Sequence, residues 1–127
     1  MKNLDQIRAA NALEAGKKEY KGVNDGQVVK KIPTMIMENG TLGSLACARE
    51  RKDNGVVKNE GHYGIWQEII EHLSHKSIAC LKQNCTPDQF ITWLSQSPDV
   101  SAGRLRAITA ETIAYLNYLR RFAKKGE

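Results

Sequence analysis

The sequence predicts an all-α fold, a single-domain helical bundle of about five to six helices over residues 1–127. Two observations support this prediction. Apolar residues recur at helical spacing through nearly the whole chain, and no segment alternates apolar and polar residues for long enough to form a strand. The length of 127 residues suits one hydrophobic core and is too short for two ordinary ones.

The first half of the chain begins with a capping signal. Asn3 can cap a first helix together with Gln6, and apolar residues then follow at helical spacing. A second helix is expected to start at Asn24 or Asp25. Pro33 lies inside it and should kink it or divide it in two, because proline lacks the amide hydrogen that a helix interior needs.

Residues 39–40 (Asn-Gly) are a strong stop signal, since glycine accepts the left-handed conformation that ends helices. A third, short helix is expected after them, with Arg49, Arg51 and Lys52 at its C-terminal end, where the helix dipole favours cations. Residues 53–61 contain two glycines, two asparagines and no periodicity. They predict a mobile loop.

The second half predicts three further elements of helical structure. Apolar residues of segment 63–73 share one helical face, and residues 86–89 (Thr-Pro-Asp-Gln) form a compact start signal for the next helix. Residues 97–99 (Ser-Pro-Asp) interrupt the chain again. A last helix is expected from near Thr109 to Lys125.

The predicted last helix separates apolar and basic residues sharply. At about 100° per residue, one arc collects the apolar side chains. Its members are Tyr115, Leu116, Tyr118, Leu119, Phe122 and Ala123. Four cations lie on the opposite side: Arg120, Arg121, Lys124 and Lys125. No acid of the same helix neutralises this stripe, whereas solvated helices commonly mix both signs at spacings of three and four.

Charge is distributed unevenly along the chain. The net charge is +5, with an isoelectric point near 9.2. Residues 104–127 hold six cations against two acids, and residues 17–31 hold five lysines against two acids, whereas residues 59–103 hold five acids against two lysines. This pattern suits a polyanion on one face and a protein neighbour on another, although solvated basic helix faces also explain it.

Candidate catalytic and metal-binding patterns are weak. His72, His75, Cys80 and Cys85 have spacings that fit zinc sites poorly, and Cys47 has no acid–base partner. We therefore expect no enzyme activity, metal or cofactor. A small metalloprotein remains the enzymatic alternative, testable by metal analysis. The odd number of cysteines predicts reduced thiols, and the absence of a long apolar run or leader-like segment predicts a cytoplasmic protein without membrane contact.

Two nucleic-acid-binding patterns were compared with the charge pattern. Residues 40–43 form a G-x-x-G, but the KH fold that uses this loop requires strands. The helices on either side of residues 39–40 also fit a helix-turn-helix, which would make the chain a DNA-binding transcriptional regulator. Recognition helices read bases near their N-terminal end, whereas the cations here come late. This interpretation is the alternative to the one below.

Two separated motifs carry a family resemblance. Segment 32–46 reads Ile-Pro-Thr-Met-Ile-Met-Glu-Asn-Gly-Thr-Leu-Gly-Ser-Leu-Ala. Segment 109–112 reads Thr-Ala-Glu-Thr, and segment 116–123 reads Leu-Asn-Tyr-Leu-Arg-Arg-Phe-Ala. Together with residues 8–12, they resemble the small helical subunit of the type III-B CRISPR RNA-targeting (Cmr) effector complex, the fifth Cmr protein. Residues 53–103 carry no part of the resemblance.

The resemblance implies a non-catalytic, architectural role in antiviral defence. Such subunits stack head to tail with copies of themselves, beside the backbone and large subunits, along the guide RNA and target RNA. The acidic segment 59–103 would then meet a basic end of the next copy. Basic side chains would face RNA phosphates, which carry no sequence information. The candidate nucleic-acid-binding residues are Lys30, Lys31, Arg49, Arg51, Lys52, Arg120, Arg121 and Lys124.

Overall fold

The structure, a computed structural model, describes residues 3–17 and 27–122. It confirms the predicted all-α fold. The helices are α1 (Leu4–Ala15), α2 (Gln27–Ala48), α3 (Glu60–Ser74), α4 (Pro87–Gln96) and α5 (Ala102–Phe122). None of the helices in the described ranges is long and apolar enough to cross a membrane.

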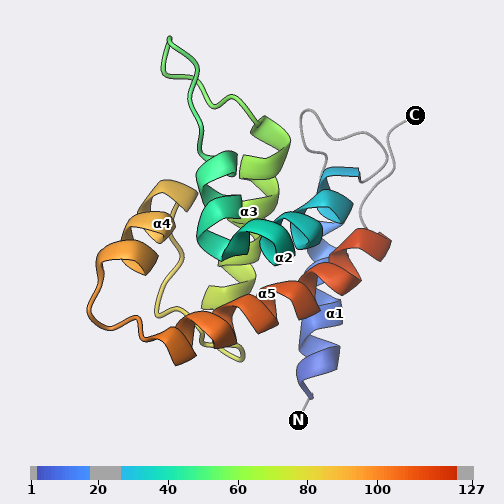
Figure 1. Cartoon of the computed structure of the whole chain (residues 1–127). Helices are drawn as coiled ribbons and strands as arrows, with labels where there is room; N and C mark the ends of the chain where they lie inside the picture. Colours follow the sequence, from blue (N-terminus) through green and yellow to red (C-terminus); the bar gives the residue numbers. More distant parts are fainter. Residues whose placement is uncertain (1–2, 18–26, 123–127) are drawn as a thin grey trace.

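The long helix α5 runs across the bundle and contacts α1, α2 and α3 (Figure 1). Helix α1 packs against α5 more extensively than any other pair of helices in the described part of the chain. Helix α4 lies at the other side, against α2 and α3. The core is built around the apolar face of α3, whose fully buried side chains are Ile65, Trp66, Ile69, Ile70 and Leu73.

Both predicted capping boxes are present. Asn3 Oδ1 accepts the Gln6 backbone N–H at 2.9 Å, and Gln6 Oε1 accepts the Asn3 N–H at 2.9 Å. Thr86 and Gln89 make the same reciprocal pair at the start of α4, at 3.2 and 3.0 Å. Each box satisfies backbone donors that the helix itself leaves unpaired.

Helix α2 corrects two predictions and confirms part of a third. Gly40 has φ 77° and ψ 170°, so the helix changes direction at the predicted stop, but its second half follows without a separate turn. The fold therefore gives no support to the helix-turn-helix alternative. Pro33 does not divide the helix, since within its described residues only Gly40 departs from helical φ and ψ. The predicted start at residues 24–25 lies outside the described residues.

Two helix boundaries differ from those predicted. Helix α2 ends at Ala48, so the cations placed at the C-terminal end of a third helix follow the helix instead. Helix α5 starts at Ala102, well before Thr109, because Ser101 caps it: Ser101 Oγ accepts the Arg104 N–H at 3.0 Å. The predicted apolar seam of α5 is confirmed, with Tyr115, Leu116 and Leu119 buried.

Candidate nucleic-acid interface

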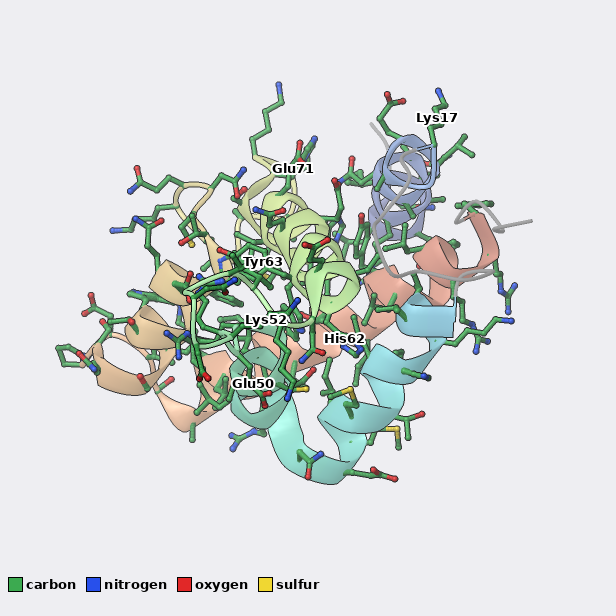
Figure 2. All side chains as sticks on the ribbon, turned by 90° about the horizontal axis from the view of Figure 1, so that it is seen from above. Lys17, Glu50, Lys52, His62, Tyr63 and Glu71 are labelled. Atoms are coloured by element: carbon green, nitrogen blue, oxygen red, sulfur yellow. The ribbon has the colours of Figure 1, made fainter. Side chains whose placement is uncertain are left out.

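Four of the candidate cations lie on two neighbouring helix ends. Lys30 and Lys31 are in the first turns of α2, and Arg120 and Arg121 are in the last turn of α5. The start of α2 and the end of α5 lie side by side in both views (Figures 1 and 2). We call this surface, formed by Lys30, Lys31, Arg120 and Arg121, the basic corner. Lys124 lies outside the described residues.

The basic corner keeps its positive charge. All four side chains are exposed, and no carboxylate in the described part of the chain pairs with them. Burial lowers the pKa of His62, and the charge of Lys31 lowers it further. The histidine nearest to this charge is thereby held in its neutral form. A surface of unpaired cations of this kind attracts polyanions.

Arg49 and Arg51 are placed differently from the basic corner. Arg49 Nε donates to Asp88 Oδ1 at 2.7 Å, and Arg51 pairs with Asp88 Oδ2. Partial burial raises the pKa of Asp88. Hydrogen bonds from Arg49 and Tyr63, with the arginine charges, outweigh this effect and leave the pKa below its ordinary value. The carboxylate therefore stays ionised and partly neutralises both arginines.

The segment between α2 and α3 is a hairpin-like excursion. Arg51 and Val57 form one antiparallel bridge, and Lys52 donates its N–H to the Val56 carbonyl at 2.8 Å. The Arg51 guanidinium lies 5.3 Å from the centre of the Tyr63 ring. Seen from above, the hairpin carries Glu50 and Lys52 over the start of α3 (Figure 2). Lys52 is exposed there, away from the basic corner.

A buried polar network under the basic surface was not predicted. Arg8 on α1 donates two hydrogen bonds to Glu111 on α5, from Nε at 2.8 Å and from Nη2 at 2.7 Å. His72 on α3 binds the same carboxylate through Nε2 at 2.9 Å. Asn11 Nδ2 lies 3.0 Å from His72 Nδ1, and the His72 ring stacks on Tyr115 at 4.1 Å between ring centres.

The network joins three helices and favours a neutral imidazole. Burial lowers the pKa of His72, and the hydrogen bond from its ring to Glu111 offsets this only in part. A carboxylate accepts and an amide NH2 donates, so the partners suit Nε2 as donor and Nδ1 as acceptor. The sequence held a signal for this network: Glu111 lies on the same face of α5 as Ile108 and Tyr115, a core position.

Acidification below about pH 6.5 is expected to destabilise the protein. The lowered pKa of His72 means that, below the ordinary histidine pKa, the unfolded chain binds a proton that the folded chain does not. Stability is therefore complete above that pH and is lost as the pH falls. Urea unfolding at about pH 7.5 and about pH 5.5 measures the loss.

His72→Gln should flatten this profile. The pKa of His62 is lowered too, so His62→Gln should flatten the remainder, and the two variants divide the pH dependence between the two histidines. Glu111 and Asp88, whose pKa values are also lowered, add losses only at more acidic pH. Identical pH profiles for the wild type and His72→Gln would contradict the assignment.

The described residues hold no group of three or more histidine, cysteine, aspartate or glutamate side chains that could bind a metal ion. In particular, His72, which belongs to the candidate zinc pattern, is instead bonded to Glu111 and Asn11. Burial raises the pKa of each cysteine thiol, at Cys47, Cys80 and Cys85. The protonated thiol is the less nucleophilic form.

Comparison with known proteins places the chain in a family. The family model described as CRISPR-associated protein (Cas_Cmr5) matches residues 2–125, nearly the whole length and both motifs that carry the resemblance. No curated protein and no solved structure matches the chain. A family match over this range, on an all-α fold, identifies the chain as a member of the Cas_Cmr5 family, the small subunit of the type III-B CRISPR–Cas (Cmr) effector complex.

Proposed function

We propose that this subunit is a non-catalytic structural component that binds the sugar-phosphate backbone of the guide RNA or target RNA. The observation that carries the proposal is the basic corner, where four exposed cations on two helix ends have no carboxylate partner in the described residues. Phosphate contacts from such cations position RNA without reading its sequence, which suits a complex in which base pairing by the guide selects the target.

The candidate residues contribute unequally to this proposal. Lys30, Lys31, Arg120 and Arg121 are its centre, and Lys124 would extend the same helix. Lys52 offers a separate exposed cation on the hairpin. Arg49 and Arg51 serve chiefly to hold the hairpin against α4 through Asp88, so their contribution to phosphate binding is smaller.

Copies of the subunit are proposed to stack head to tail with one another and beside the other Cmr subunits. A repeating stack requires two different surfaces on each copy. The basic corner is one candidate, and the exposed carboxylates of segment 59–103 are the other. Because Asp88 is paired within the chain and Glu68 is buried, Glu60 and Asp99 are the clearest exposed acids left for that contact.

The RNA proposal is tested with two matched double variants. Lys30→Gln with Arg120→Gln removes one lysine and one arginine from the basic corner. Lys76→Gln with Arg106→Gln removes the same charges from exposed positions elsewhere. In effector complexes assembled with each variant, RNA affinity is measured over a range of salt concentrations.

We expect the corner variant to weaken binding alike for every target sequence and to reduce the salt-dependence slope by about one per lost phosphate contact. The control variant should match the wild type. An unchanged slope for the corner variant, in a complex of normal composition, would exclude the basic corner as an RNA contact.

A further inference from the structure

A hollow of about 1000 Å³ lies between residues 81–85, α4 and the start of α5, on the α4 side of the bundle (Figure 1). Its walls combine one aromatic ring, two cations and three amide side chains. These are Trp93, Lys82, Arg104, Gln83, Asn84 and Gln89. Neither the family resemblance nor the basic corner accounts for this combination.

One wall of the hollow is a flat stacked pair. The Arg104 guanidinium carbon lies 4.9 Å from the centre of the Trp93 ring. Fully buried Phe90 supports the same ring, at 6.3 Å between centres and 18° between planes. Arg104 is itself fixed in the first turn of α5, where its N–H binds Ser101 Oγ. Aromatic rings and guanidinium planes are the surfaces on which proteins stack unpaired bases.

The amide side chains leave donors directed to a ligand. Gln89 Oε1 accepts the Thr86 N–H and Asn84 Oδ1 accepts the Cys85 N–H, so in both residues the NH2 group is the half not used by these bonds. Amide NH2 groups donate to the carbonyl oxygens and ring nitrogens on base edges. The hollow thus offers stacking and hydrogen bonding together.

The charge of the hollow suits a single phosphate. Lys82 and Arg104 oppose one acid, Asp99, and no carboxylate in the described ranges is paired with either cation. We propose that this hollow binds one unpaired nucleotide of an RNA strand, with its base against Trp93 and Arg104 and its phosphate near Lys82. The proposal rests on the proposed RNA-binding function and adds a second site to it.

The hollow and the basic corner can be tested separately because they lie at opposite ends of α5. Arg104 and Arg120 are separated by about 24 Å along that helix, at 1.5 Å per residue. Variants at one end therefore leave the other end intact.

The test is titration of the full chain with a ten-nucleotide oligouridylate and with an abasic oligonucleotide of the same length. Trp66 is fully buried, so quenching of tryptophan fluorescence reports on half-buried Trp93. Arg104→Gln is the principal variant, since its side chain is half-buried on the surface, and Lys82→Gln is compared with Lys76→Gln as a matched control. Trp93→Leu, which keeps apolar contact with Phe90, tests the ring directly.

We expect the oligouridylate to quench fluorescence and to bind more tightly than the abasic strand. Arg104→Gln and Trp93→Leu should each weaken binding between about fivefold and one hundredfold, the range for loss of one stacked base. Lys82→Gln should weaken it more than Lys76→Gln does.

Equal affinity for the two oligonucleotides, absence of quenching, or capture of a protein segment in the hollow in place of RNA would overturn the proposal. Hollow variants that bind like the wild type, beside a basic-corner variant with a reduced salt slope, would refute the hollow alone and leave the proposed function standing. Loss of the slope change as well would refute both.

Discussion

We expect Glu111→Gln to lower the free energy of unfolding by about 3 kcal/mol. The Glu111 side chain is 10% exposed, and its two oxygens accept the hydrogen bonds of Arg8 and His72. Glutamine has nearly the same shape, but its NH2 group must face a donor from one of these partners. It also leaves the Arg8 charge, only 19% exposed, without its carboxylate.

The matched control for this prediction is Glu14→Gln. Glu14 pairs with Lys17 at 3.2 Å, and both side chains are largely exposed, so the same chemical change should cost less than about 1 kcal/mol. Urea unfolding of both variants at neutral pH measures the difference. A loss for Glu111→Gln no greater than that for Glu14→Gln would show that the network does not hold α1, α3 and α5 together.

The fold was predictable where local chemistry decides it. Asn3 and Thr86 each cap a helix with a residue three positions later, and the structure confirms both caps. The early start of α5 was missed because Ser101 lacks a glutamate or glutamine partner three residues on and because Gly103 lowers helix propensity. The hairpin was not predicted because its bridge depends on Asp88, which is distant in sequence.

The candidate site was only partly predictable, for a related reason. The exposed cations of the two helix ends follow from periodicity, since residues next to a buried seam on a helix face solvent. The pairing of Arg49 and Arg51 with Asp88 is a tertiary contact, which periodicity does not show. The hollow combines residues from three segments, and no local pattern in any one of them indicates it.

The end of α1 is expected to tolerate only glycine at position 16. Gly16 has φ −65° and ψ −13°, which alanine adopts readily, and such a change would ordinarily stabilise by reducing the entropy of the unfolded chain, by about 0.4–1 kcal/mol. Here, however, an added Cβ would lie 2.5 Å from the Phe122 carbonyl oxygen and 2.7 Å from its carbon. Both atoms are backbone, so α1 and α5 must move apart.

Gly16→Ala should therefore lower the free energy of unfolding by about 1–2 kcal/mol, the cost of overpacking less the entropic gain. Gly103→Ala is the matched control with the opposite sign. Its Cβ would meet only side-chain atoms at 3.7 Å or more, so it should stabilise α5 by about 0.5–1 kcal/mol. Because Phe122 follows Arg121 directly, displacement of this contact should also move the basic corner, and RNA affinity of folded Gly16→Ala should fall. Stabilisation by both substitutions would mean that α1 does not dock on the end of α5.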